Sequence, residues 1–231
     1  MDNKCIVSFG KGHNFERGVD RLQNYVSNLV KIPFFGFKEY PKYCPTHQES
    51  PFAFKFYCIQ ECYKKEFTSI LWLDSSVIIK NDLSEVFNYI DTQGYFFIKN
   101  WHSCGMYCHD KALITLGITR EDSFNIPSIQ GTNFGLNLSF EKSRMFLNIL
   151  LGLSTDGITF PGPCDNENFH ASKNLGVKGH RHEQTAMSII ALKLGMNNWW
   201  VQEEHKWFIH DRQYVKQVAG TTEDIDMSNN E

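Results

Sequence analysis

The chain has 231 residues, of which 42% are hydrophobic, enough for one large α/β domain with a sizeable core. Its net charge of −3 gives no basic excess for a phosphate backbone, which argues against a general nucleic-acid binder. No apolar stretch is long enough to span a bilayer or resembles a secretion signal, so we expect a soluble, cytoplasmic protein. The seven cysteines form no regular framework, and we interpret most of them as small core residues.

The first half of the chain alternates between short apolar runs, which predict strands, and amphipathic stretches, which predict helices. Apolar residues recur at helical spacing after Asn14, a candidate N-cap, and Ser50-Pro51 is typical of a helix start. This alternation predicts a twisted parallel sheet with helices on both faces. The predicted strands are residues 5–10, 33–37, 69–73 and 77–79, and the predicted helices are residues 14–30, 50–62 and 81–90.

The second half is less regular and predicts a mixed arrangement of strands and helices. Residues 161–178 are rich in Gly, Pro and Asn, and a loop of that length is more often functional than idle. We expect a single domain over residues 1–220 and a disordered acidic tail over residues 221–231. The predicted strands are residues 95–98, 132–138, 199–201 and 207–209, and the predicted helices are residues 141–151 and 182–194.

Asp74 directly follows the uncharged, β-prone run from Ser69 to Leu73, which predicts a buried strand of a parallel sheet. Ligands of open α/β sheets bind at the carboxyl ends of the strands, where an acidic residue can hold a metal and, through it, phosphate oxygens. The Asp-Ser-Ser sequence is equally typical of an ordinary turn after a strand. This segment alone leaves both interpretations open.

The order of several motifs is more informative than any one of them. In chain order they are Ser8-Phe9-Gly10, the helix start around Lys55, Leu71-Trp72-Leu73-Asp74-Ser75-Ser76, Asn81-Asp82-Leu83, Gln130 to Asn137, and Arg181 to Thr185. This succession resembles the glycosyltransferases of the GT-A fold, over roughly residues 5–210. The resemblance implies a single α/β domain with a mostly parallel, twisted sheet flanked by helices, Rossmann-like in its N-terminal half and mixed in its C-terminal half.

The resemblance implies an enzyme that transfers a sugar from a nucleotide-diphosphate sugar, with a UDP-sugar favoured, to a hydroxyl of a glycan or another acceptor. The family's Asp-x-Asp motif holds Mn²⁺ or Mg²⁺, but Ser76 stands where the second acid usually does, so metal affinity should be weaker or another side chain must complete the site. In many members a histidine near the C-terminus does so, and we favour His210 over His205. The metal ligands expected are thus Asp74, Ser76 and His210.

The resemblance also places Glu183 and Gln184 opposite the sugar or the acceptor. Glu183 and Asp165 are then the two candidates for the general base, although Glu183 could equally serve only to stabilise the first turn of its helix. Lys11, Arg17 and Lys55 could balance the charge of the diphosphate. The residues expected to bind the nucleotide sugar are Ser8, Phe9, Gly10, Arg17, Lys55, Asp74, Ser75, Ser76, Gln130, Asn133 and Gln184.

Three other interpretations remain. A non-catalytic nucleotide-sugar or glycan-binding domain would account for the missing second acid. A nucleotidyltransferase would normally show a glycine-rich basic loop, which only Gly10-Lys11-Gly12 approaches. A zinc site within residues 101–109, which hold two cysteines and two histidines, is disfavoured because its Cys-to-Cys spacing is wider than that of usual zinc knuckles.

Overall fold

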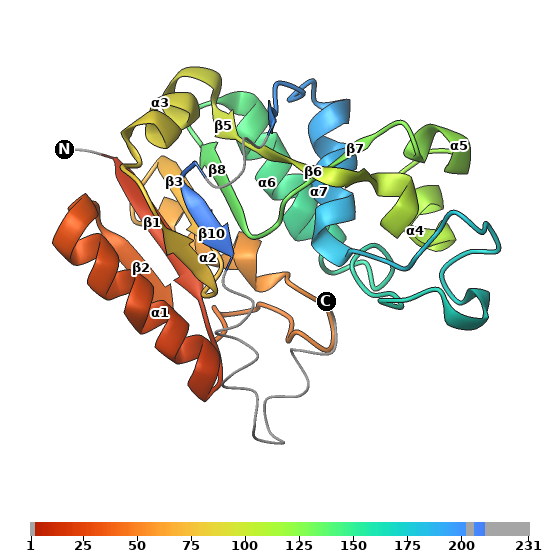
Figure 1. Ribbon diagram of the computed structural model, residues 1–231, viewed down its shortest axis with the longest axis horizontal. Helices are drawn as coiled ribbons and strands as arrows, with labels where there is room; N and C mark the ends of the chain where they lie inside the picture. The colour runs from red at the N-terminus through yellow and green to blue at the C-terminus, as the bar shows by residue number, and fades with distance from the viewer. Residues whose placement is uncertain (1–2, 202–205, 211–231) are drawn as a thin grey trace.

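A computed structural model of the chain describes residues 3–201 and 206–210 (Figure 1). Its centre is a five-stranded mixed sheet, and β1 pairs in parallel with β2 and β3 while β8 is antiparallel to β3 and β5. Four strands therefore share one direction, so the predicted mostly parallel sheet is confirmed. The strand order is β2 (Phe34–Phe37), β1 (Lys4–Phe9), β3 (Ser69–Leu73), β8 (Asn133–Asn137) and β5 (Tyr95–Phe96).

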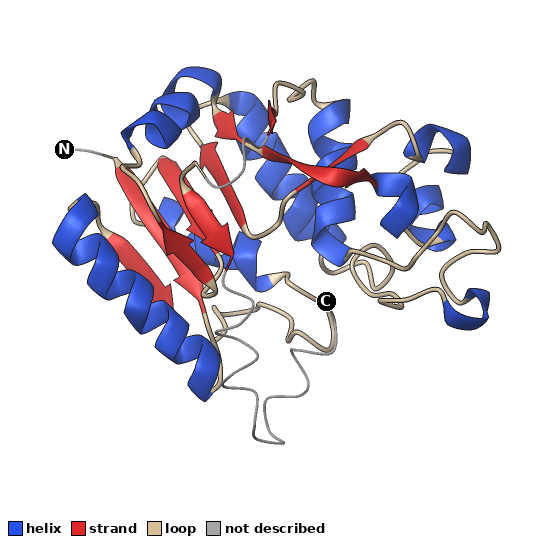
Figure 2. Cartoon of the chain, viewed as in Figure 1, coloured by secondary structure: helices blue, strands red, loops and turns tan. Residues whose placement is uncertain are grey.

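Helices cover both faces of this sheet (Figure 2). On one face α2 (Phe54–Lys64), α6 (Glu141–Leu153) and α7 (His182–Lys193) enclose the larger apolar cluster. On the other face α1 (His13–Tyr25) and α3 (Ser84–Gln93) enclose a second cluster. Successive side chains of a strand point to opposite faces. Burial of both faces therefore explains why β3 is an unbroken apolar run.

Two small sheets flank the central one. In the first, β4 (Val77–Ile79) pairs antiparallel with β10 (Phe208–His210). In the second, β6 (Ile98–Ser103) lies between β7 (Pro127–Ile129) and β9 (Trp200–Val201). The remaining short elements are a π-helix (Val26–Val30), α4 (Asp110–Thr115), α5 (Arg120–Ser123) and 3₁₀ turns at Cys104–Tyr107 and Glu167–Phe169.

The chain-order prediction is corrected at several boundaries. Asn14 does not cap α1, because the helix begins after Gly12 and Asn14 is a buried residue inside it. Likewise α2 begins at Phe54 rather than at Ser50, since Phe52 has a left-handed backbone with φ 62. The strand expected over residues 95–98 is divided between β5 and β6, and α4, α5 and β7 were not predicted at all. The predicted tail and His205 lie outside the described residues.

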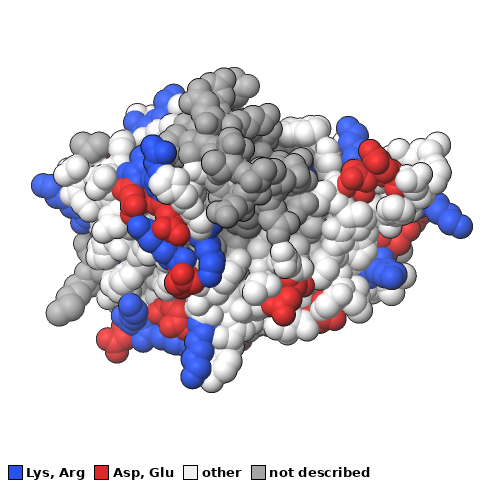
Figure 3. Space-filling model, turned by 90° about the horizontal axis from the view of Figure 1, so that it is seen from below, with Lys and Arg blue, Asp and Glu red and all other residues white. Residues whose placement is uncertain are grey.

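No helix in the described part of the chain is long and apolar enough to cross a membrane. Five of the seven cysteines are buried and none is in a disulfide, which confirms their interpretation as core residues. Within residues 101–109 the cysteines and histidines are divided among β6, the following 3₁₀ turn and the residues before α4, and no described residues form a metal-holding cluster of three or more His, Cys, Asp or Glu. Seen from below, Lys/Arg and Asp/Glu side chains are intermixed on the surface (Figure 3). Two exposed ion pairs of the described residues are Lys11–Glu39 and Lys38–Asp20.

Candidate active site

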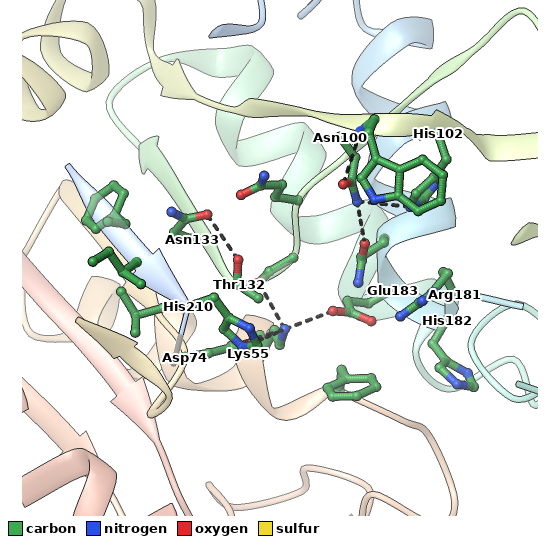
Figure 4. A pocket seen from close by; sticks show the side chains of 18 residues that line it. Lys55, Asp74, Asn100, His102, Thr132, Asn133, Arg181, His182, Glu183 and His210 are labelled. Atoms are coloured by element: carbon green, nitrogen blue, oxygen red, sulfur yellow. Dashed lines mark hydrogen bonds and ion pairs between the residues drawn. The ribbon is translucent and has the colours of Figure 1, made fainter. Parts of the chain in front are cut away.

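A pocket of about 340 Å³ lies where β3 ends and β8 begins, between the central sheet and the unit formed by β6 and α7 (Figure 4). Its walls therefore come from both halves of the chain. The lining residues are Phe52, Lys55, Asp74, Val77, Asn100, Trp101, His102, Gln130, Gly131, Thr132, Asn133, Arg181, His182, Glu183, Gln184, Phe208, Ile209 and His210.

The floor of the pocket is a charge cluster built around Lys55. The Lys55 Nζ lies 2.8 Å from Glu183 Oε1 and 3.2 Å from Asp74 Oδ1, and it donates to the Gly131 carbonyl at 2.9 Å. Lys55 and Glu183 are each the second residue of a helix, α2 and α7, and both side chains are at most 2% exposed. Asp74 follows β3 and is 22% exposed, so its carboxylate is the member of the cluster that faces the open pocket.

The cluster holds one cation and two carboxylates, and this imbalance sets its protonation. Burial alone would lower the pKa of Lys55, but the carboxylates of Asp74 and Glu183 outweigh it and raise the pKa. Burial raises the pKa of Glu183, and Asp74 adds to this effect while Lys55 opposes it. The cationic form of Lys55 is therefore favoured, and Glu183 takes up a proton more readily than an exposed glutamate does.

Neighbouring contacts fix both carboxylates. The Trp72 indole N–H donates to Asp74 Oδ1 at 2.6 Å, and the Asp74 backbone N–H donates to the Thr132 carbonyl at 2.8 Å. Glu183 Oε1 binds Lys55, whereas Oε2 has no hydrogen-bond partner within the described structure. The Gly131 backbone passes so close that a Cβ there would lie 2.5 Å from Glu183 Oε1.

Polar side chains line the rest of the pocket. Asn100 Nδ2 lies 3.0 Å from His102 Nε2 and donates to Gln184 Oε1 at 3.4 Å, and Thr132 Oγ1 donates to Asn133 Oδ1 at 3.1 Å. Burial lowers the pKa of His102, which favours the neutral imidazole. Amides, a hydroxyl and a neutral imidazole offer both donors and acceptors to an uncharged polar ligand.

Seven of the predicted site residues line this one pocket. The antiparallel pairing of β10 with β4 places His210 opposite Val77, just beyond Asp74, and Figure 4 shows its ring on the same side of the pocket as Asp74. The turn interpretation of the Asp74 segment is confirmed, since the Val77 N–H donates to the Asp74 carbonyl and closes a turn, while the metal-binding interpretation stays a prediction. The seven residues are Lys55, Asp74, Gln130, Asn133, Glu183, Gln184 and His210.

The other predicted residues are not brought to the pocket lining. Ser75 and Ser76 are buried in the turn after β3, with the Ser75 carbonyl accepting from Arg21. Asp165 is exposed on the long loop, where its carboxylate accepts the Glu167 N–H at 2.9 Å.

The end of β1 and the start of α1 lie outside the lining as well. Ser8 is buried, Phe9 stacks on Phe54 with 4.3 Å between ring centroids, and Gly10 is buried against α1. Arg17 is exposed on α1, and Lys11 pairs with Glu39.

Several lining residues were not identified from the sequence as part of this site. Asn100, Trp101 and His102 come from β6, which the sequence suggested only as part of a disfavoured zinc site. The available sequence signal was the run Asn100-Trp101-His102, in which polar and aromatic residues follow the strand predicted over residues 95–98. Arg181 and His182 precede Glu183, and His182 has a left-handed backbone with φ 42, an uncommon conformation for a histidine.

No protein-family model matches the chain, and no curated protein does. Among solved structures, it is similar to a glycosyltransferase involved in the glycosylation of the major capsid of PBCV-1, with 15% identity and a TM-score of 0.39 over 63% of this chain and 66% of that one. It is also similar to apo mouse xyloside xylosyltransferase 1, with 10% identity and a TM-score of 0.45 over 86% and 84% of the two chains. A third is the apo WbbM bifunctional glycosyltransferase, with 10% identity and a TM-score of 0.42 over 99% of this chain and 51% of that one.

The chain thus spans slightly under two thirds of the first of these structures and about half of the third. All three are glycosyltransferases. TM-scores below 0.5 are too low to support a conclusion about the function of this chain, so its function has to be argued from the pocket.

Proposed function

We propose that the chain is a glycosyltransferase that moves a sugar from a nucleotide-diphosphate sugar, with a UDP-sugar favoured, to a hydroxyl of an acceptor. The observation that carries this proposal is the buried cluster of Lys55, Asp74 and Glu183 in a pocket lined by amides. It combines a group suited to accept a proton with donors and acceptors for sugar hydroxyls.

Glu183 is the general base of this proposal. Its Oε1 is held by Lys55, and its buried Oε2 has no partner within the described residues, so one oxygen is fixed and the other keeps an unused acceptor position. The acceptor O–H gives its proton to Oε2, and the acceptor oxygen forms a bond to the anomeric carbon of the donor. The bond from that carbon to the diphosphate oxygen breaks, and its electron pair leaves with the nucleoside diphosphate.

A divalent cation fits this site if it binds together with the donor diphosphate, and not in the absence of the donor. The cluster carries one negative charge in excess, and Asp74 and His210 line the pocket together. Mg²⁺ commonly binds through one or two carboxylates together with substrate phosphates. Asp74 and His210 would hold Mg²⁺ or Mn²⁺, and the ion would stabilise the leaving diphosphate. Ser76, buried outside the pocket lining, is not included in this set.

A screen of nucleotide sugars tests the proposal, with donor hydrolysis and calorimetric binding measured with and without Mn²⁺. We expect one donor to bind and to be hydrolysed, and Asp74→Asn to bind it at least tenfold more weakly. Asp20→Asn is the control, because Asp20 lies on the surface and pairs with Lys38. Failure of every donor to bind would contradict the proposal.

The second candidate is a non-catalytic nucleotide-sugar or glycan-binding domain. The missing second acid of the Asp-x-Asp motif favours a binding domain, since Ser76 at that position supplies only a hydroxyl and is buried in the protein. The same screen separates the two functions. A binding domain would bind a donor tightly and show neither hydrolysis nor transfer with any acceptor.

A further inference from the structure

Trp101 is an exposed aromatic side chain at the mouth of the pocket. All five tryptophans of the chain lie in the described residues, and Trp101 is 76% exposed, whereas Trp72 and Trp207 are 0% and 3% exposed. Trp101 nevertheless lines the same pocket as Asp74 and Glu183. A large indole that stays in water beside a polar pocket is a common feature of ligand sites, because it offers a rigid contact surface.

The ring is held in place by its neighbours on β6. The Trp101 backbone N–H donates to Asn100 Oδ1 at 3.2 Å, and the indole meets the His102 ring edge-on, with 5.1 Å between centroids. The ammonium group of Lys178 lies 6.0 Å from the indole centroid. Since β6 pairs with β7 at Lys99 and at Ser103, on either side of Trp101, the ring is presented from a strand and not from a loose loop.

We propose that Trp101 is the platform on which a saccharide acceptor stacks, so that the acceptor of this enzyme is a sugar ring; this inference rests on the proposed function. The face of an indole is electron-rich and attracts polarised C–H groups such as those on one side of a pyranose ring. Asn100 and Gln184, which are bonded to each other beside Trp101, can bind the hydroxyls at the edge of that ring. A lipid acceptor would instead need a wide apolar surface, and Trp101 is surrounded by polar side chains.

The position of Trp101 assigns it to the acceptor rather than to the donor nucleotide. The indole of Trp101 meets the ring of His102 edge-on, and His102 lies on the same side of the pocket as Glu183, whereas Asp74 and His210 lie on the other side (Figure 4). Glu183 must touch the acceptor hydroxyl if it is the base, and Asp74 must lie near the diphosphate. A stacking ring on the Glu183 side therefore receives the acceptor.

Fluorescence quenching tests the contact itself. Acrylamide should quench the fluorescence of Trp101 most strongly among the five tryptophans. The saccharides added to protect Trp101 are lactose, maltose, xylobiose and diacetylchitobiose, each with and without UDP. We expect at least one of them to reduce quenching of the wild type about twofold and to leave Trp101→Phe unaffected. If no probe protects Trp101, the inference is wrong.

Transfer kinetics with the protecting saccharide and the donor found by the screen complete the test. For Trp101→Ala we expect the acceptor KM to rise about 10-fold, equivalent to about 1.4 kcal/mol, with a smaller rise for Trp101→Phe and with donor affinity and hydrolysis unchanged. Tyr43→Ala, which removes an aromatic ring that is 82% exposed and outside the pocket lining, should behave as wild type.

Two results separate this inference from the proposed function. If Trp101→Ala leaves the acceptor KM unchanged, or if it loses donor affinity, the inference about Trp101 is wrong but the proposed transferase function is not affected. If saccharides protect Trp101 but the chain binds no nucleotide sugar, the proposed transferase function is wrong and Trp101 is supported as a saccharide-binding residue.

Discussion

At the scale of single residues, the site depends on one buried ammonium group shared by two carboxylates. The Lys55 Nζ is within 3.2 Å of oxygens from both Asp74 and Glu183, so neither carboxylate is fully compensated. A buried charge is costly unless it is paired and hydrogen-bonded. Burial raises the pKa of Glu183, and the carboxylate of Asp74 adds to this effect while Lys55 opposes it, which makes Glu183 a better proton acceptor than an exposed acid.

Glu183→Gln should lower turnover by about 10²-fold or more, because glutamine keeps the shape of glutamate but cannot accept a proton. Donor affinity measured by calorimetry should change little. The wild-type rate should fall as pH drops through the raised pKa of Glu183, which lies above the ordinary 4.5, and the variant should lack this dependence. Asp165→Asn is the matched control, and a larger loss there than at Glu183 would transfer the role of base to Asp165.

Lys55→Met should destabilise the fold by about 3–5 kcal/mol, because it leaves a buried carboxylate without its cation. Urea denaturation at pH 7 measures this loss. Lys64→Met, at an exposed ion pair with Glu61, should cost less than about 1 kcal/mol. The double variant Lys55→Met/Glu183→Gln should recover part of the loss, and no recovery would mean that the cluster is not energetically coupled.

At the scale of elements, the residues of the candidate site come from the ends of helices and strands and not from their central residues. Lys55 and Glu183 lie in the first turns of α2 and α7, Asp74 follows β3, and Thr132 precedes β8. The end of β3 and the start of β8 lie at the same edge of the sheet because these two strands are antiparallel, with Leu73 opposite Asn133. Gly131 lets the strand leading into β8 pass beside Glu183, since any side chain would meet Glu183 Oε1 and Gln184 Cγ.

Gly131→Ala should therefore displace Glu183 and lower turnover at least tenfold, with a smaller effect on donor binding. The control is Gly152→Ala in α6, where a Cβ would meet nothing within 4 Å. Alanine is a better helix former than glycine, so this control should stabilise the protein by about 0.5–1 kcal/mol and leave turnover alone. Turnover and urea denaturation of both variants provide the comparison. A fully active Gly131→Ala enzyme would show that the position of Glu183 is not critical.

At the scale of the whole molecule, a histidine cluster attaches the long loop to the site. The rings of His109 and His180 are 4.3 Å apart and those of His180 and His182 are 5.2 Å apart. Their nitrogens contact loop carbonyls, as in His182 Nδ1 with Phe160 O at 2.8 Å. Because His182 adjoins Glu183, the loop and the proposed base share one anchor.

This cluster should make the protein less stable in acid. Burial lowers the pKa of His109 and His180, and it lowers that of His182 to about 4. The unfolded chain binds protons near pH 6.5 and the folded chain does not, so the free energy of unfolding should fall as pH drops from 6.5 towards 4, by about 3 kcal/mol for His182 alone.

Urea denaturation at several pH values checks this dependence. His182→Asn should flatten it, since asparagine tolerates the left-handed backbone and does not titrate. His170→Asn, on the exposed part of the loop, should keep the wild-type slope. An unchanged slope in His182→Asn would contradict the prediction.

The sequence by itself determined the larger elements and the direction of the main sheet. Long periodic stretches such as those of α1 and α6, and the apolar run of β3, are local signals that burial on one or both faces imposes directly. Asp74 could be selected because it follows such a run, whereas Lys55 and Glu183 were selected through the resemblance to GT-A glycosyltransferases. The short helices α4 and α5 escaped prediction, since four to six residues carry too little periodicity to reveal a helix.

Only the tertiary structure decided which candidates meet. Lys55 and Glu183 are 128 positions apart in the chain, and no local pattern states that their side chains share a hydrogen bond. The same packing turned Ser76 into the protein, left Asp165 on the surface and brought Trp101 to the pocket. Such contacts arise from how helices settle on a twisted sheet, which depends on the volume and shape of side chains from the whole chain and not on the residues beside each motif.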